Sequence, residues 1–163
     1  MSYVIAPTAE VHFAGLHQAL DVIARERRFL AIFETPPFSD SVTFYRRVIA
    51  NDFCQFVALD QDSVVGWCDI LPSHGQARAH VGVLGIGVVP NARGKGLGRR
   101  LMAETISKAR SKGFTRIELS VRTDNAPAKA LYESFGFCVE GLHHCAHLVD
   151  GKYIDGCSMA LLL

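Results

Sequence analysis

A short basic and glycine-rich segment, residues 88–100, is the part of the sequence whose composition most clearly suggests chemistry. Glycines at alternate positions leave space for backbone N–H groups to converge on an anion. A helix that begins within such a segment adds unpaired N–H groups and the positive end of its dipole. The segment therefore predicts a site for a diphosphate group. The segment also brings four basic side chains together within eight residues: Arg93, Lys95, Arg99 and Arg100.

Two familiar diphosphate motifs do not match this segment. A P-loop places Ser or Thr after its Gly-Lys pair, whereas Lys95 is followed by Gly96. The dinucleotide fingerprint needs a Gly-x-Gly-x-x-Gly spacing and an acidic residue about 20 positions further on, which the strand end at 119–121 does not offer. ATP and NAD are therefore disfavoured. A structural loop with a solvated basic face is the alternative at this point, because short motifs also match by chance.

The elements that would position this segment follow from periodicity and turn signals. An apolar strand is expected over 79–89, and its glycines (Gly82, Gly85 and Gly87) would weaken it unless something approaches its backbone closely. Apolar residues at helical spacing predict a helix over 97–112. Further elements are expected as a strand at 115–121, a helix at 126–135, and two strands at 137–148 and 153–162 joined by the Asp150-Gly151 turn.

Residues 3–71, which precede these elements, are expected to form a strand, two helices and a hairpin. A helix that Ser39 or Asp40 would cap is expected to place Phe44, Val48 and Ile49 inward. The full order is mixed α and β, with one βαβ crossover around the glycine-rich loop. The expected ranges are a strand at 3–6, a helix at 9–28, a break at Pro36-Pro37, the second helix up to residue 49, and hairpin strands at 54–60 and 63–71.

Two motifs together resemble the GNAT superfamily of N-acetyltransferases. The family's acetyl-CoA signature, Arg/Gln-x-x-Gly-x-Gly/Ala between a strand and a helix, is matched by Arg93, Gly96 and Gly98. The family's next segment is matched by residues 125–137. The resemblance is close over 79–137 and elsewhere concerns only the order of elements. It implies an α/β (α+β) fold, namely a single acyl-CoA N-acyltransferase domain over residues 1–163, with a twisted, mixed, mostly antiparallel sheet flanked by helices.

The resemblance further implies acetyl-CoA as co-substrate. Loop amides would bind its pyrophosphate, and a strand backbone would pair with its pantetheine arm like an added strand. Tyr132 matches the family tyrosine near the thioester sulfur, so it is expected to protonate the leaving thiolate, with plain core packing as the alternative. The expected acetyl-CoA ligands are Ile86, Gly87, Val88, Arg93, Gly94, Lys95, Gly96, Leu97, Gly98, Arg99 and Asn125.

The base and the acceptor site are less clearly marked. Many family members carry a glutamate on the strand before the loop, but residues 80–84 contain no carboxylate. The remaining candidates for the base are Glu34, Asp69, His80 or a water relay. Glu34, before two prolines, is also expected to attract a cationic amine, with a solvated loop acid as the alternative. If strand alternation holds, Val65, Trp67 and Asp69 share a face, so Trp67 and Asp69 are expected to line the acceptor pocket, although a core indole and a surface acid fit equally well.

A run of histidines and a cysteine at residues 143–147 raises the question of a metal site. On a strand only His143, Cys145 and His147 would share a face. A zinc site needs four converging ligands, and the spacing here matches none of the familiar zinc patterns. We therefore expect no metal.

Composition limits the partners. The chain has 163 residues, a net charge of +1 and 49% hydrophobic residues, so no bulk charge points to nucleic acid or to a membrane surface. No apolar run is long enough to span a bilayer, and no signal peptide is seen. Five cysteines without a Cys-x-x-Cys pair favour a reduced, cytoplasmic protein.

The predicted activity is direct transfer of an acetyl group from acetyl-CoA to a primary amine of a small molecule or amino acid, within a ternary complex. The loop at 34–37 and the hairpin at 150–155 resemble the phosphinothricin and amino-acid branch of the family. A protein or peptide N-terminal acetyltransferase is one alternative. A non-catalytic acyl-CoA sensor is another, since the strand glutamate is missing. The resemblance also implies a homodimer.

Overall fold

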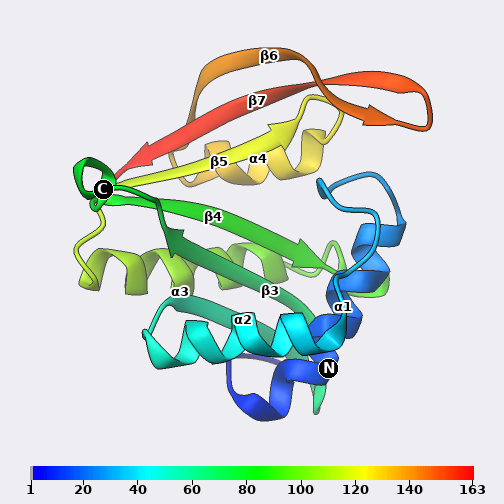
Figure 1. Cartoon of the computed structure of the whole chain (residues 1–163), viewed down its shortest axis with the longest axis vertical. Coiled ribbons are helices and arrows are strands. Elements are labelled where there is room, and N and C mark those ends of the chain that lie inside the picture. Colours follow the sequence, from blue (N-terminus) through cyan, green and yellow to red (C-terminus); the bar gives the residue numbers. More distant parts are fainter. Residues whose placement is uncertain (1) are drawn as a thin grey trace.

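A computed structural model describes residues 2–163 of the chain. Its centre is a seven-stranded sheet in the order β1-β2-β3-β4-β5-β7-β6, and among the described residues every neighbouring pair is antiparallel except β4 and β5 (Figure 1). This confirms the predicted mixed, mostly antiparallel sheet. The strands are β1 (Tyr3–Pro7), β2 (Cys54–Asp60), β3 (Ser63–Pro72), β4 (Val81–Val88), β5 (Arg116–Arg122), β6 (Cys138–Val149) and β7 (Lys152–Leu162).

Helices cover both faces of the sheet. Two clusters of buried hydrophobic residues lie on opposite faces of the sheet. One contains residues of α1 and α2, and the other contains residues of α3 and α4 (Figure 1). The helices are α1 (Phe13–Arg25), α2 (Phe38–Ala50), α3 (Leu97–Ser111) and α4 (Ala126–Ser134), with short 3-10 turns η1 (Glu10–His12), η2 (Gln76–Arg78) and η3 (Pro90–Ala92). The inward face of α3 agrees with the expected one, because Leu101, Met102, Thr105, Ile106 and Ala109 are all buried.

The parallel pair β4 and β5 separates along its length. The two strands pair only from Val81 to Val83 on β4, whereas β3 continues beside β4 as far as Val88. Residues 84–88 of β4 therefore have a strand neighbour on the β3 side alone. The result is a wedge that opens toward the glycine-rich loop and the start of α3 (Figure 1).

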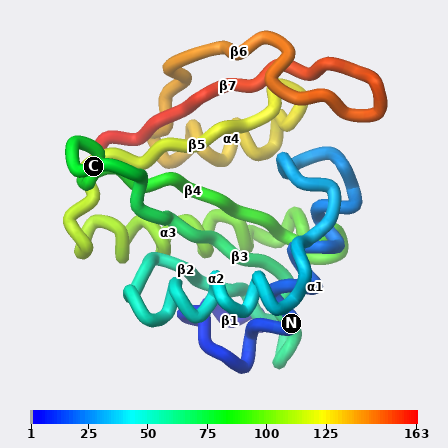
Figure 2. Tube along the Cα trace, viewed as in Figure 1, coloured from blue at the N-terminus to red at the C-terminus, as the bar shows by residue number. Residues whose placement is uncertain are grey.

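The segment between α1 and α2 lies over this wedge. Figure 2 shows it rising from the end of α1 toward the β6–β7 hairpin. An ion pair joins the two regions, with Arg27 Nη2 lying 2.8 Å from Asp150 Oδ1. This segment and the hairpin therefore close one side of the opening between β4 and β5.

Both N-terminal helices differ from their predicted forms. The first was expected over 9–28, but α1 starts at Phe13 after η1 and ends at Arg25, because Arg27 adopts a positive φ of 55°. The second is N-capped by Pro37 rather than by Ser39 or Asp40. Its buried stripe is Ser41, Tyr45 and Val48, while Phe44 and Ile49 are exposed. Hydrophobic residue type was a poorer guide here than the i, i+4, i+7 spacing.

Two strand irregularities also overturn expected faces. A register shift opposite Val65 places its side chain in the cluster on the α3 side, whereas Trp67 packs on the α1 side. Val65 therefore does not share a face with Trp67. On β6 the register shifts between His143 and His147, and Cys145 has a positive φ of 54°. Because a bulge breaks alternation, these three residues do not form the single face that alternation predicted.

Candidate active site

A cavity of about 380 Å³ occupies the wedge between β4 and β5. We call it the wedge cavity. Residues of α1 and the following segment (Ile23, Phe29 and Leu30) lie on one side of it, and α4 lies on the other. Most of the predicted acetyl-CoA ligands line it, together with Tyr132, whereas Lys95 and Arg99 do not. The predicted ligands that line it are Ile86, Gly87, Val88, Arg93, Gly94, Gly96, Leu97, Gly98 and Asn125.

Two glycines of the loop have backbone conformations that suit an anion site. Gly94 and Gly96 have φ values of 72° and 77°, in the left-handed region that favours glycine. Gly96 is the N-cap of α3 and no side chain caps this end, so the first N–H groups of the helix have no partner within it. A Cβ atom at either glycine would have no heavy atom within 4 Å, so the approach to these amides is open.

The basic side chains do not converge on the wedge cavity as their spacing suggested. Arg93 turns back to the protein: its Nε donates to the Val88 carbonyl at 2.8 Å, its two terminal nitrogens bond the Glu26 carboxylate, and it lies over the Phe29 ring. Arg99 donates to Ser134 Oγ at 3.1 Å, on α4. The Arg93–Glu26 ion pair joins the loop to the end of α1, a contact that the sequence did not reveal.

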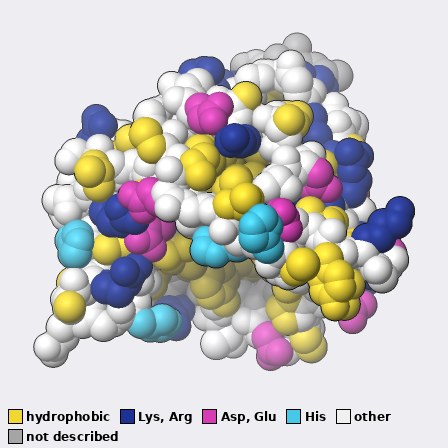
Figure 3. Space-filling model, turned by 90° about the horizontal axis from the view of Figure 1, so that it is seen from above, with side chains coloured by type: hydrophobic (Ala, Val, Ile, Leu, Met, Phe, Trp, Pro, Cys, Tyr) yellow, Lys and Arg dark blue, Asp and Glu magenta, His cyan; other side chains and the backbone are white. Residues whose placement is uncertain are grey.

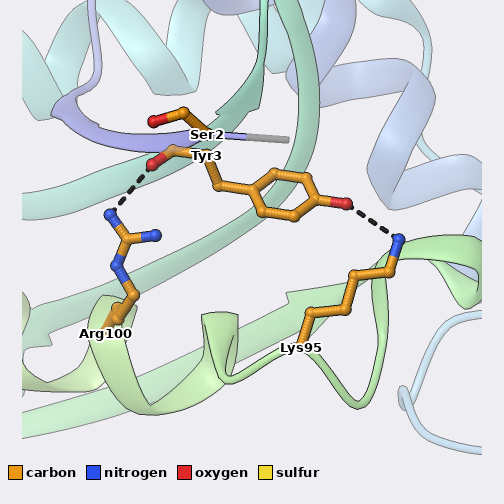
Figure 4. Close-up of a pocket in the computed structure, with 4 residues that line it drawn as sticks. All are labelled: Ser2, Tyr3, Lys95 and Arg100. Atoms are coloured by element: carbon orange, nitrogen blue, oxygen red, sulfur yellow. Dashed lines mark hydrogen bonds between the residues drawn. The ribbon is translucent and has the colours of Figure 1, made fainter.

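Lys95 and Arg100 reach toward β1 on another surface (Figure 4). Lys95 Nζ donates to the Tyr3 hydroxyl at 2.8 Å, and Arg100 Nη2 donates to the Tyr3 carbonyl at 2.9 Å. Two of the four positive charges therefore fasten the start of α3 to the first strand. The start of α3 at the wedge cavity therefore presents backbone amides rather than these cationic side chains.

Side chains of the neighbouring strand approach the glycines of β4 closely. A Cβ atom at Gly87 would come closer than 3.0 Å to the Trp67 indole, and one at Gly85 would lie 3.1 Å from Asp69 Oδ1. A Cβ atom at Gly82 would likewise clash with Ile70. Side chains of β3 thus lie across the glycines of β4. Through these contacts the indole of Trp67 and the carboxylate of Asp69 reach the strand that borders the wedge cavity.

We expect Gly87→Ala to lower the free energy of unfolding by about 1–3 kcal/mol, because the added methyl group must displace the rigid indole of Trp67. Gly85→Ala is the matched comparison on the same strand, since there the methyl group meets only the movable end of Asp69. Urea unfolding of both variants measures the difference. Equal losses at the two positions would contradict this account of the Trp67 contact.

Tyr132 on α4 points its ring into the interior beside the wedge cavity. It is 7% exposed and packs against Phe137 with ring centroids 6.0 Å apart. Burial, and to a lesser degree the nearby Cys68, raise the pKa of its hydroxyl above the ordinary value of 10.0. The hydroxyl therefore stays protonated at neutral pH and is able to donate a proton or hydrogen bond. Asn125, at the N-cap of the same helix, accepts a bond from the Ala128 N–H at 3.3 Å, which leaves its amide nitrogen as a donor.

A second cavity of about 230 Å³ lies on the α1–α2 side of the sheet. Trp67 and Asp69 both line it, as expected for an acceptor pocket. Gln55 Nε2 donates to Asp69 Oδ2 at 3.2 Å. Burial raises the pKa of Asp69 to about 6, against the opposing effects of hydrogen bonds from Gln55 and the Gly85 amide. Asp69 and Trp67, which line the second cavity, thus lie beside Gly85 and Gly87, which line the wedge cavity.

The other candidate bases lie elsewhere. The Glu34 side chain is 74% exposed, lines neither cavity, and lies 3.8 Å from Arg25 Nη2. The neighbouring Thr35 is held by two 3.1 Å hydrogen bonds to Asp21, so the backbone there is restrained even though Glu34 itself faces solvent. His80 is exposed next to the start of β4, at the end of that strand remote from the loop.

The histidine-rich stretch of β6 is engaged in local hydrogen bonds. His143 bonds Ser158 at 3.1 Å, and His144 bonds Asp155 at 3.0 Å. Asp155 also accepts the Cys145 N–H at 2.8 Å. Within residues 2–163 no group of three or more His, Cys, Asp or Glu side chains is placed to hold a metal ion. None of the helices in that range is long and apolar enough to cross a membrane.

Comparison with known proteins identifies the family. The profile described as "Acetyltransferase (GNAT) family" matches residues 18–137, well over half of the chain. The L-amino acid N-acetyltransferase AaaT of Escherichia coli (strain K12) is 36% identical over 107 residues, which cover 65% of this chain and 66% of AaaT. The mycothiol acetyltransferase of Kocuria rhizophila is 41% identical over 80 residues, which are 48% of this chain but only 26% of that protein.

A solved structure supports the fold independently of close sequence identity. The phosphinothricin acetyltransferase from Sinorhizobium meliloti, solved in complex with acetyl-CoA, superposes with a TM-score of 0.92 at 19% identity, covering 100% of this chain and 89% of that one. The elements around the glycine-rich loop, β4, α3, β5 and α4, follow in the order that the sequence predicted. The chain therefore belongs to the GNAT family of acetyltransferases.

Proposed function

We propose that this chain transfers the acetyl group of acetyl-CoA directly to the primary amine of a small molecule or amino acid, with both substrates bound together. The observation that carries the proposal is the wedge cavity, in which an uncapped helix N-terminus, an unpaired strand edge and a buried tyrosine meet. The relatives that use an amino acid or are bound to acetyl-CoA support the same chemistry.

The described residues fit acetyl-CoA on three counts. The open amides around Gly94 and Gly96 suit a pyrophosphate. The edge of β4 from Leu84 to Val88 faces no strand on the β5 side, so its backbone groups suit the amides of a pantetheine arm. The Asn125 amide nitrogen is a further donor beside that arm. Bound acetyl-CoA supplies an acetyl thioester, whose C–S bond breaks as the amine nitrogen forms a C–N bond to the carbonyl carbon.

Asp69 and Tyr132 are the residues that we propose to accept and to donate the protons of this transfer. An ammonium acceptor must lose one proton before its nitrogen is nucleophilic, and we propose Asp69, beside Gly85, to take it. Tyr132 donates a proton to the departing sulfur, and the second proton lost by the nitrogen replaces it through water. Glu34 is the alternative base, acting from the solvent-exposed segment between α1 and α2.

The loop provides the first test of the proposal. We expect Gly96→Val to weaken acetyl-CoA binding by about tenfold or more while the protein stays folded. A β-branched residue at a φ of 77° is strained by about 1–2 kcal/mol or more, and its side chain would point into the open approach to the amides. Calorimetric titration of acetyl-CoA into the folded variant measures the change. Unchanged affinity would remove the pyrophosphate assignment and with it the proposed cofactor site.

The setting of the reaction is also part of the proposal. A reducing cytoplasm suits the five cysteines, all of which are free. A homodimer is supported by the edge strand β6, which exposes Val139, Leu142 and Leu148. In Figure 3, which looks onto the side of β6 and β7, hydrophobic side chains gather near the middle of the face next to histidines.

A further inference from the structure

The second cavity has a one-sided charge. Its polar lining consists of Asp40, Ser41, Gln55, Tyr45 and Asp69, and no Lys, Arg or His lines it. Among the described residues neither of the two aspartates forms an ion pair. A poorly solvated carboxylate without a cationic partner is costly, so the cavity favours a ligand that brings a positive charge.

Gln55 holds the Asp69 carboxylate in the lining of the cavity. Gln55 is 3% exposed, and its Oε1 atom is buried without a hydrogen-bond partner. Its amide nitrogen must face Asp69, because a carboxylate only accepts hydrogen bonds, so the amide cannot be turned over to relieve Oε1. The cavity thus offers the Asp69 carboxylate as an acceptor, and the amide nitrogen of Gln55 holds that carboxylate in place. A primary ammonium group, which carries a positive charge and three N–H donors, matches this carboxylate.

The rest of the lining is apolar and aromatic. Phe44, Tyr45 and Trp67 supply rings, and Leu16 and Leu20 of α1 supply aliphatic surface. Rings around a cation add favourable contacts with its charge, and they bury an apolar body attached to it. The volume of about 230 Å³ lies below the roughly 300–1,000 Å³ typical of sites for drug-sized ligands. A single ring or a short chain is therefore the suitable size.

We propose that the second cavity binds the acceptor, and that this acceptor is a small cationic amine with an apolar, ring-sized body and no carboxylate beside its amino group. The inference rests on the proposed acetyl transfer and narrows its substrate class. An α-carboxylate would lie next to Asp69 without any lining cation to offset it, and like charges in contact disfavour binding. The ammonium would lie against Asp69 and hence beside Gly85 of the wedge cavity.

Every element around Asp69 contributes to its electrostatic surroundings. Asp40 and Tyr45 face the cavity from α2, and burial raises the pKa of Tyr45 to about 12, so it stays neutral. His17 of α1 does not line the cavity, but its Nε2 is 3.0 Å from the carbonyl oxygen of Pro36, which does. Cys68 lies on the opposite side of β3, and burial raises the pKa of its thiol, which also stays neutral. The net field of these groups on a ligand at neutral pH is therefore negative.

A comparison of three ligands of one shape tests the inference by binding alone. 2-Phenylethylamine, phenylalanine and 2-phenylethanol share a ring and differ in the added carboxylate and the missing charge. In calorimetric titrations of the full chain saturated with CoA, we expect the amine to bind about tenfold or more tightly than either of the others. Asp69→Asn should weaken amine binding by about 10- to 100-fold, the range for a lost hydrogen bond to a charged group. Asp62→Asn, the same change at an exposed turn of the same hairpin, should have no effect.

The outcomes separate this inference from the proposed function. Phenylalanine or 2-phenylethanol binding as tightly as the amine would overturn the inference, as would tighter binding of a peptide with a free N-terminus. Tight amine binding without thiol release from acetyl-CoA would keep the binding site and overturn acetyl transfer. If Asp69→Asn fails to fold, the ranking of the three ligands on the unmodified chain still decides the question.

Discussion

We expect Tyr132→Phe to lower kcat about 10²-fold and to leave the affinity for acetyl-CoA nearly unchanged. The substitution keeps the ring that packs on Phe137 and removes only the hydroxyl, so the fold and the wedge cavity are preserved. A positioned proton donor contributes about 10²–10⁴ to a rate, and the lower end suits a thiolate, which is already a fair leaving group. Steady-state release of free thiol measures kcat, and calorimetry measures acetyl-CoA binding.

The pKa of Tyr132 adds a second readout. Since burial raises that pKa above 10.0, ionisation of the hydroxyl should not reduce kcat of the unmodified chain between pH 7 and 10. Tyr153→Phe is the matched control, because this tyrosine is exposed on β7 and lines neither cavity. A variant at position 132 with the kcat of the unmodified chain, under conditions where chemistry limits the rate, would assign Tyr132 to packing alone.

The sequence predicted the elements around the glycine-rich loop better than it predicted the directions of the charged side chains beside them. The glycine-rich loop and the start of α3 were predicted because they follow from local spacing, whereas Tyr132 was singled out by the resemblance to the family. The direction of a long side chain does not follow from spacing. Arg93 pairs with Glu26, a residue 67 positions earlier in the chain, and Lys95 bonds Tyr3, 92 positions earlier. Such partners appear only when distant elements are packed together.

The contact partners of the β4 glycines also could not be predicted from the sequence. Their presence in an apolar strand correctly indicated close approach to its backbone. The approaching groups are the Trp67 and Asp69 side chains of the neighbouring strand. Which side chains lie opposite the glycines depends on the register between β3 and β4, and the sequence specifies that register only in outline. The bulges opposite Val65 and at Cys145 were equally invisible, because a one-residue insertion in a ladder has no reliable signature in hydrophobic alternation.

Asp69→Asn should lower kcat/KM for the acceptor by about 10²-fold or more, since one carboxylate is proposed both to hold the ammonium and to accept its proton. The pH dependence carries the diagnostic sign. A carboxylate acts as a base only when ionised, and the pKa of Asp69 is raised to about 6, so kcat/KM of the unmodified chain should fall as pH drops below about 6. That acidic limb should be absent in the variant, whereas a purely structural role for Asp69 would leave it in place.

Glu34→Gln is the competing variant in the same experiment. The Glu34 carboxylate of the unmodified chain is exposed and close to Arg25, so removing its charge should change kcat/KM little if Asp69 is the base. A large loss in Glu34→Gln together with a normal rate and a retained acidic limb in Asp69→Asn would transfer the role to the segment between α1 and α2. Thermal melting of both variants controls for folding. The carboxylate that β4 lacks would then be supplied either from β3, across Gly85, or from that segment, and the variant that loses the acidic limb identifies which.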